Sequence, residues 1–119
     1  MATGLDNLTI YRLAEDLEIK VYKITKLFPK DERFRSIDQL RRSSASVCNN
    51  IAEGYNKHTK NQKIHFMAIA KGEAEETKRG FIRSSKKGFI SKELGYEVAE
   101  QYTDLLKAIS GFIRFIRKT

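Results

Sequence analysis

The chain has 119 residues, a length that suits one compact domain, residues 1–119, and is too short for two. Hydrophobic residues make up 40% of it and charged residues 32%, which excludes a disordered tail, while a single cysteine, Cys48, excludes an internal disulfide framework and a finger-type zinc site. Lys and Arg number 23 against 15 Asp and Glu, and the formal charge of +8 favours polyanionic partners such as nucleic acid.

The first predicted helix spans residues 9–27, where apolar residues recur at helical spacing along one face. Its end is set by Pro29, because the residue before a proline is pushed out of the helical region. The apolar face comprises Ile10, Leu13, Ala14, Leu17, Val21 and Ile24.

The second predicted helix spans residues 36–55. Ser36–Gln39 has the capping-box pattern, in which the serine side chain accepts from a backbone N–H group at the helix start. Gly54 is the expected stop. The apolar stripe comprises Ile37, Leu40, Ser44, Val47, Cys48 and Ile51.

The third predicted helix spans residues 60–87, and Thr59 is its expected capping residue. Gly72 lies in its middle, where glycine costs about 1 kcal/mol relative to alanine, so we expect close packing against another helix there. Gly88 suits the left-handed residue that ends a helix. The expected inner face comprises Phe66, Ile69, Ala70, Ala74, Thr77 and Phe81.

The fourth predicted helix spans residues 91–117, with Ser91 as its cap, and carries a heptad seam. Leu106, Ile113 and Phe115 lie off that seam, which indicates either a subunit interface or apolar residues scattered over the surface. The seam comprises Val98, Tyr102, Leu105, Ile109, Phe112 and Ile116.

The connections between these helices are short, so consecutive helices must run antiparallel. No segment shows the alternation of a strand. The pattern predicts an all-α protein with an up-down-up-down antiparallel four-helix bundle. No apolar stretch approaches the roughly 20 residues that cross a bilayer, and the start of the chain does not resemble a signal peptide. We therefore expect a cytoplasmic protein with no membrane contact.

Residues that carry chemistry are sparse. His58 and His65 are seven residues apart, which does not suit a metal pair on a helix, and Cys48 lies on an apolar stripe where a buried thiol is unreactive. The glycines are isolated, so no phosphate-binding loop is indicated. We expect no catalytic residue, no metal and no cofactor. A helical-bundle ribonuclease is the enzymatic alternative.

Antiparallel packing gathers basic residues at the two ends of the bundle. Such clusters predict contact with the phosphate backbone of RNA or DNA, with strong salt dependence and little sequence preference. Tyr55 is the only aromatic residue close to the cluster of Lys57, Lys60 and Lys63, which argues against sequence-specific binding of single strands. We expect the contacts from Arg41, Arg42, Arg83, Lys86 and Lys87 at one end, where Lys26, Lys30 and Arg33 also gather, and from Lys57, Lys60, Lys63, Arg114 and Arg117 at the other.

Two alternatives compete with nucleic-acid binding. The basic residues of the third helix, Lys78, Arg79 and Arg83, would form a solvated, salt-bridged face if they paired with the acids of the fourth helix. The off-seam apolar surface of the fourth helix would instead serve a protein-interaction scaffold with a partner of unknown identity. The acids concerned are Glu93, Glu97, Glu100 and Asp104.

Several segments resemble the 23S ribosomal-RNA intervening-sequence protein family, whose members are also called four helix bundle proteins. They are Phe28–Phe34, Gln39–Ser44 and Ser46–Gly54, with a looser match over Phe66–Glu76 and Leu94–Tyr96. The resemblance covers nearly the whole chain, and its most specific part is the Asn-Ile-Ala-Glu-Gly run that ends at Gly54.

The resemblance implies an up-down four-helix bundle that assembles into a homopentameric ring, without enzymatic activity. Members were first noticed as reading frames inside insertions in ribosomal RNA genes. A related branch serves as the accessory protein of diversity-generating retroelements, where a basic ring binds nucleic acid and the reverse transcriptase. Cys48 stands where members often carry proline, and Glu73 replaces a small polar residue. Because of these departures, we do not carry the reverse-transcriptase partner over to this chain.

The family motif residues Arg41, Asn50, Ala52, Glu53 and Gly54 have two interpretations. Arg41 could bind phosphate while Asn50 and Glu53 organise the adjoining surface. Alternatively, all three polar residues satisfy hydrogen bonds within or between subunits. Polar groups beside the apolar stripe of a bundle more often do the second, so we favour a structural or interface role.

Overall fold

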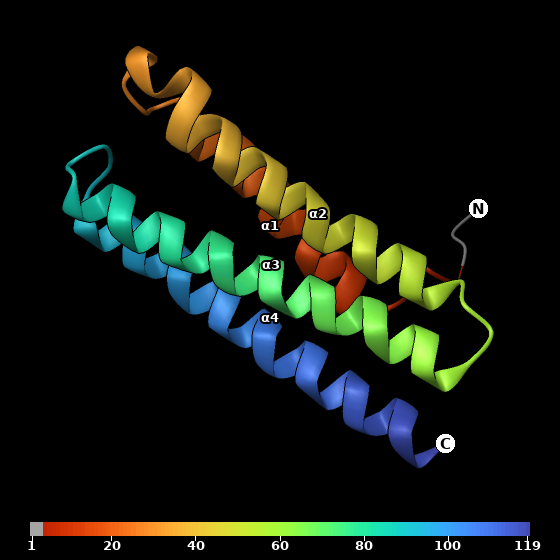
Figure 1. Cartoon of the computed structure of the whole chain (residues 1–119). Coiled ribbons are helices and arrows are strands. Elements are labelled where there is room, and N and C mark those ends of the chain that lie inside the picture. Colours follow the sequence, from red (N-terminus) through yellow and green to blue (C-terminus); the bar gives the residue numbers. More distant parts are fainter. Residues whose placement is uncertain (1–3) are drawn as a thin grey trace.

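A computed structural model describes residues 4–119, which form an all-α four-helix bundle with no strand in that range, confirming the predicted fold class. The helices are α1 (Thr9–Thr25), α2 (Asp38–Tyr55), α3 (Lys60–Lys86) and α4 (Lys92–Lys118). Two short helical segments precede α2: a 3-10 turn, η1 (Lys30–Glu32), and a π-helical turn, η2 (Arg33–Ile37). Consecutive helices run antiparallel, and the bundle measures 45 × 26 × 22 Å (Figure 1).

The bundle has two ends with different chain segments. We call the "turn end" the one with the α1–α2 and α3–α4 connections, residues 26–37 and 87–91. The "terminal end" holds the α2–α3 connection, residues 56–59, together with the start of α1 and the end of α4 (Figure 1). Helix α1 has 17 residues and α4 has 27, so α1 is too short to pack along the full length of α4.

The apolar stripes of all four helices meet in one core. Val21, Val47, Met67, Phe81 and Tyr102 are fully buried there, one or more from each helix. Burying a large apolar side chain stabilises a fold by about 1.5–3 kcal/mol, so this core is the main source of stability.

The predicted burial of two residues is wrong: Leu13 is 39% exposed and Ile69 is 38% exposed. Each lies one residue from a buried alanine, Ala14 or Ala70, and one residue turns the side chain by about 100° around a helix. On α3, the buried face begins with Met67 instead.

Helix α2 does not begin with the predicted serine cap. Ser36 lies inside η2, where its hydroxyl donates to Glu32 Oε1 at 2.7 Å, and α2 has no side-chain cap. The π-helical turn leads directly into α2, and the Asp38 N–H donates to the Arg35 carbonyl, so this donor has a partner without a side-chain cap. The caps predicted for α3 and α4 are confirmed, since Thr59 and Ser91 each accept from a backbone N–H at 3.1 Å.

The glycines were only partly predicted. Gly88 has φ +82°, and the Phe89 N–H donates to the Ser84 carbonyl at 3.0 Å, which is the expected left-handed helix ending. Gly72 does not mark a close helix crossing, because an added Cβ would meet nothing within 4 Å. Gly54 is not a stop, since α2 continues to Tyr55; a Cβ there would lie 3.0 Å from Phe66 Cβ, so Gly54 allows α2 and α3 to approach.

The helices of the bundle do not resemble membrane spans. No helix within residues 4–119 combines the length and the apolar character that a membrane span requires.

Candidate nucleic-acid interface

Arg41 is held by internal contacts at the turn end. Its Nε donates to Thr25 Oγ1 at 2.9 Å and its Nη2 to the Tyr22 carbonyl at 3.3 Å. The guanidinium also lies 4.4 Å from the centroid of the Tyr22 ring. Thr25 is fully buried and donates to the Val21 carbonyl. Arg41 therefore joins the start of α2 to the last turn of α1.

Arg42 behaves differently from its neighbour. Its side chain is 80% exposed and its Nε lies 3.2 Å from Asp38 Oδ2, one helical turn earlier. An exposed pair of this kind contributes at most about 1 kcal/mol, so a phosphate can compete with Asp38 for Arg42.

Basic side chains surround a hollow of about 330 Å³ at the turn end. Lys26, Lys30, Arg33 and Arg41 line it together with the buried ring of Phe28. Sequence reasoning placed Lys26, Lys30 and Arg33 at this end but did not select them as contacts. Their common hollow depends on the path that η1 and η2 take between α1 and α2, which the spacing of residues does not reveal.

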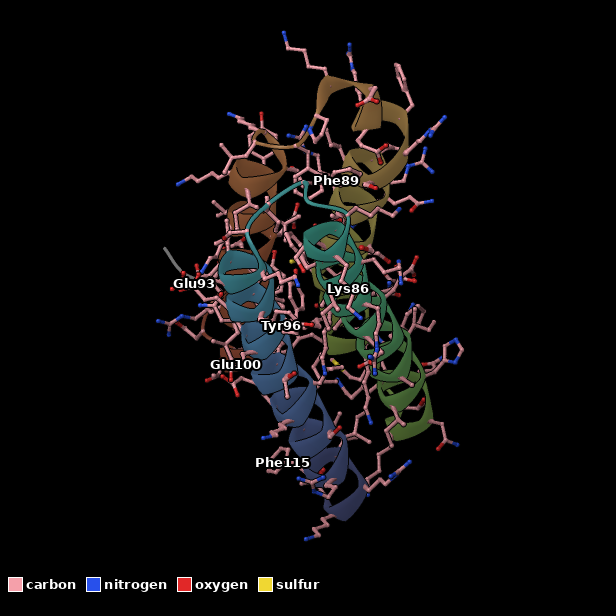
Figure 2. The ribbon with its side chains drawn as sticks, turned by 90° about the vertical axis from the view of Figure 1, so that its left-hand side faces the viewer. Lys86, Phe89, Glu93, Tyr96, Glu100 and Phe115 are labelled. Atoms are coloured by element: carbon pink, nitrogen blue, oxygen red, sulfur yellow. The ribbon has the colours of Figure 1, made fainter. Side chains whose placement is uncertain are left out.

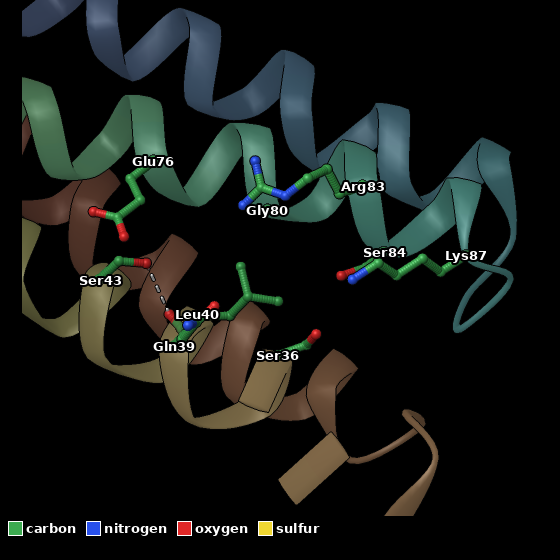
Figure 3. A pocket seen from close by; sticks show the side chains of 9 residues that line it. All are labelled: Ser36, Gln39, Leu40, Ser43, Glu76, Gly80, Arg83, Ser84 and Lys87. Atoms are coloured by element: carbon green, nitrogen blue, oxygen red, sulfur yellow. Dashed lines mark hydrogen bonds between the residues drawn. The ribbon is translucent and has the colours of Figure 1, made fainter. Parts of the chain in front are cut away.

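A second, smaller cavity of about 50 Å³ lies between α2 and α3 at the same end. Figure 3 shows the Arg83 side chain lying along α3 beside Gly80, with Ser36 and Gln39 opposite. Lys87 also lines this cavity, and its Nζ lies 5.8 Å from the Phe89 ring centroid. The cavity has room for a few water molecules but not for a ring-sized group.

The terminal end carries a pocket of about 230 Å³. Lys63 Nζ donates to the Tyr55 carbonyl at 3.0 Å and lies 5.9 Å from the Tyr55 ring centroid. Lys57 Nζ instead pairs with Glu53 Oε1 at 3.0 Å. The pocket is lined by Gly54, Tyr55, His58, Lys60, Lys63, Phe112, Phe115, Ile116 and Thr119.

Arg114 and Arg117 do not join that pocket. They line an open groove of about 740 Å³ on another face of α4, between α3 and α4. The groove floor includes the apolar residues Ile64, Leu106 and Ile113. The five basic residues predicted at this end are therefore divided between two surfaces and one ion pair.

The predicted pairing of α3 bases with α4 acids does not occur within residues 4–119. Arg79 pairs with Glu75 of its own helix at 3.0 Å, and Glu97 pairs with Lys20 of α1 at 3.4 Å. Figure 2 shows Glu93 and Glu100 along the first half of α4, with Phe115 near the other end of this helix. Among the ten predicted contact residues, those without an acid partner in the described range are Lys60, Arg83, Lys86, Lys87, Arg114 and Arg117, besides the internally bonded Arg41 and Lys63.

The remaining motif residues also have contacts within the chain. Asn50 Nδ2 donates to the Ser46 carbonyl at 2.8 Å, and Ala52, half-buried, accepts at its carbonyl from Asn56 Nδ2 at 3.1 Å. Glu53 holds Lys57, and Gly54 lies against α3. Each of these motif residues therefore has a contact within the chain, and the structural or interface role stays a prediction.

The Cys48 thiol and the Tyr102 side chain are both buried in the core, away from the surface. Burial raises the pKa of the Cys48 thiol, and Glu18 raises the pKa further, so the thiol stays protonated at neutral pH. Burial likewise raises the pKa of Tyr102, whose hydroxyl has no hydrogen-bond partner among residues 4–119. His58 and His65 are both exposed. No three His, Cys, Asp or Glu side chains of residues 4–119 converge so that they could hold a metal ion.

Sequence reasoning missed the aromatic wall of the terminal-end pocket. Phe115 is 61% exposed, and its ring centroid lies 6.2 Å from that of Phe112 in a stacked arrangement. Its position off the heptad seam was the available signal, but the spacing could not show that it lies beside Lys60 and Lys63.

Comparison with solved structures places the same fold in another protein. The crystal structure of a protein with unknown function from the S23 ribosomal protein family of Bacteroides thetaiotaomicron matches with a TM-score of 0.82 and 20% identity. The match covers 89% of this chain and 96% of that one. Comparison with curated proteins gives no match. The family model for the 23S rRNA-intervening sequence protein matches residues 6–111, which confirms the resemblance seen in the motifs, and the chain belongs to this family.

Proposed function

We propose that this protein is a non-enzymatic, oligomeric RNA- or DNA-binding protein that contacts the phosphate backbone. The observation that carries the proposal is the turn-end hollow, where Lys26, Lys30, Arg33 and Arg41 line one surface without an acidic side chain. Phosphate oxygens are the ligands that such a surface attracts, and the neutralised charges release counterions when nucleic acid binds.

The other proposed contacts extend this surface. Arg42, Arg83, Lys86 and Lys87 belong to the turn end, and Lys60, Lys63, Arg114 and Arg117 to the terminal end. Arg41 contributes charge to the hollow, while its Nε and Nη2 donate to Thr25 and Tyr22 within the chain. Lys57 is the weakest of the proposed contacts because Glu53 already holds it.

The absence of enzymatic activity is part of the proposal. An RNA-cleaving site needs an acid, a base and a cation that converge on one phosphate. Neither exposed histidine has a charged partner among residues 4–119; His65 contacts Phe66 with ring centroids 5.2 Å apart. This arrangement supports binding without cleavage.

Salt-dependent binding to a short RNA tests the proposal. The double variant Lys26→Gln/Lys30→Gln should weaken binding and lower the slope of log affinity against log salt by up to about 1.4 for a single strand, since each phosphate contact contributes about 0.7. The matched control, Lys78→Gln/Lys107→Gln, removes the same charge from residues outside the hollow and should change the slope less. A flat salt dependence of the unmodified protein, or no binding near 50 mM salt, contradicts the proposal.

Assembly into a homopentameric ring is the second part of the proposal. The α3–α4 groove supports it, because its floor includes the apolar residues Ile64, Leu106 and Ile113. Arg114 and Arg117 line the same groove and would then lie at the boundary between subunits. A second copy that covered this floor would remove apolar surface from water. Light scattering of the purified protein gives the mass; a monomer at micromolar concentration contradicts the ring. A monomer that captures a stable protein partner through the groove instead supports the scaffold function.

A further inference from the structure

We propose that the terminal-end pocket binds one unpaired nucleotide of a nucleic acid, with the base against Phe115 and the phosphate at Lys60 and Lys63. The inference rests on the proposed function and adds a preference for single strands over duplex.

The pocket is built by three helices and the connection between two of them. Its lining comes from the end of α2, residue 58 of the connection, the start of α3 and the end of α4, and includes no residue of the shorter α1. At about 230 Å³ it is smaller than the roughly 300–1,000 Å³ of pockets for drug-sized ligands, so it suits a single planar base.

One wall of the pocket is aromatic. Phe115 exposes 61% of its surface although it is apolar, and Phe112 supports it from one side with ring planes inclined by 26°. Ile116 beneath them is buried in the core, which fixes this turn of α4. An exposed ring on a fixed turn provides a stacking face that loses little conformational freedom when a base covers it.

The other wall is cationic. The hydrogen bond from Lys63 Nζ to the Tyr55 carbonyl holds the Lys63 ammonium group at the pocket, and Lys60 makes no ion pair with any residue from 4 to 119. An aromatic face beside ammonium groups matches the two parts of a nucleotide, a planar base and an anionic phosphate. A purely apolar ligand would leave the ammonium groups without a counter-charge, and an acidic peptide would leave Phe115 uncovered.

A base inside a duplex cannot use this wall, because its two faces are covered by neighbouring base pairs, and only the two terminal pairs have an open face. The pocket therefore selects for unpaired nucleotides, whereas the hollow at the turn end offers cations without an accessible aromatic wall. The preference comes from stacking and not from hydrogen bonds to base edges, so it carries little sequence specificity.

The lack of tryptophan in the chain allows a direct test. The variant Phe115→Trp places a single indole in the pocket wall, and Tyr96→Trp places one among Glu93, Glu97 and Glu100 of α4, where Tyr96 is 47% exposed. Titration with single-stranded oligoadenylate should quench the indole fluorescence of F115W and leave that of Y96W nearly unchanged. A blunt RNA duplex of the same length should quench neither indole strongly.

Affinity measurements complete the test. Phe115→Ala should weaken binding of the single strand about five- to 150-fold, which corresponds to about 1–3 kcal/mol per stacked base, and leave duplex affinity unchanged. Phe115→Leu keeps apolar bulk without an aromatic face and should lose most of the same affinity, while Tyr96→Ala, among the acidic residues of α4, should lose none.

Four outcomes overturn the inference. Equal quenching by single strand and duplex removes the preference for unpaired nucleotides. A Phe115→Ala variant with unchanged affinity removes the pocket from binding, and both of these outcomes leave the proposed function standing. A change of oligomeric mass in Phe115→Ala without a change in affinity means that a second copy of the chain covers the pocket. Absence of binding to any nucleic acid overturns both this inference and the proposed function.

Discussion

The two ends of the bundle are similar in charge but different in the chemistry that surrounds the charge. At the turn end, the aromatic ring of Tyr22 is already used by cations, with Lys26 Nζ at 4.6 Å and the Arg41 guanidinium at 4.4 Å from the ring centroid. At the terminal end, Phe115 exposes its ring beside Lys60 and Lys63. The turn end also has the exposed ring of Phe34, but the Arg33 guanidinium lies over it at 5.3 Å from the centroid. The turn end therefore suits phosphates and the terminal end suits a nucleotide.

The difference follows from how each end is closed. The turn end is closed by two connections whose rings pack together, Phe28 and Phe89 having centroids 5.6 Å apart. The terminal end has one connection and no cover from α1 over the pocket. A bundle with unequal helices thus leaves apolar surface open at one end, and net charge alone does not reveal it.

The largest expected stability effect separates two adjacent arginines at the turn end. Arg41→Ala should lower the free energy of unfolding by about 2 kcal/mol, because it removes charged hydrogen bonds to Thr25 and Tyr22. Arg42→Ala removes an exposed ion pair and should cost less than about 1 kcal/mol. Urea unfolding measures both changes.

The same two variants should have the reverse order in RNA affinity, since Arg42 is free to exchange Asp38 for a phosphate. Arg41→Lys keeps the charge but not the forked donor geometry, and should lose most of the stability that Arg41→Ala loses. If Arg41→Ala weakens RNA binding and leaves unfolding unchanged, the internal role assigned to Arg41 is wrong.

A smaller stability effect is expected from a methyl group at the terminal end. Gly54→Ala places a Cβ 3.0 Å from Phe66 Cβ and 3.2 Å from the Lys63 carbonyl oxygen, neither of which is a flexible side-chain end. Overpacking costs about 1–3 kcal/mol and the helix preference of alanine returns about 1 kcal/mol, so a net loss of about 1 kcal/mol is expected in urea unfolding.

Gly72→Ala is the matched control for this substitution. It adds the same methyl group to a helical glycine where nothing lies within 4 Å, and should stabilise the protein by about 1 kcal/mol. Equal effects of the two substitutions would show that Gly54 does not set the distance between α2 and α3.

The fold was largely predictable because each helix carries enough apolar residues to define one face. Val47, Leu105 and Ile109 follow directly from helical spacing and are buried. The burial of Ile69 was predicted wrongly because hydrophobicity alone cannot tell which of two adjacent apolar residues faces the core. In the packed bundle the neighbouring Ala70 faces the core and Ile69 does not. The π-helical turn that takes Ser36 out of its predicted cap has no signature in the residue types.

The candidate site was less predictable than the fold. Composition and antiparallel topology placed the basic residues at the two ends, but which of them have acid partners depends on individual side-chain contacts, such as Lys57 with Glu53. The pocket at the terminal end joins Phe115 to Lys60 across two helices that are distant in sequence. No local pattern encodes such a pairing, because it depends on the relative length and register of α3 and α4.

The smallest expected effect is a pH-dependent change in the free energy of unfolding. It compares the start of α2 at the turn end with the start of α3 at the terminal end. The pKa of Glu32 lies below its ordinary value of 4.5, mainly because the Ser36 hydroxyl donates to the carboxylate. A lowered pKa means that the folded state favours the ionised form. This contribution to stability is therefore complete above about pH 4.5 and is lost as the pH falls through the lower pKa of the folded state.

Ser36→Ala should consequently reduce the free energy of unfolding near neutral pH, and the difference from the unmodified protein should shrink below pH 4.5. Thr59→Ala, at the start of α3, removes a hydroxyl that accepts from the neutral Gln62 N–H, so its loss of about 1 kcal/mol should not vary with pH. Urea unfolding across the acidic range measures both. A pH-independent loss in Ser36→Ala would mean that Ser36 acts as an ordinary helix cap after all, and that the two ends begin their helices in the same way.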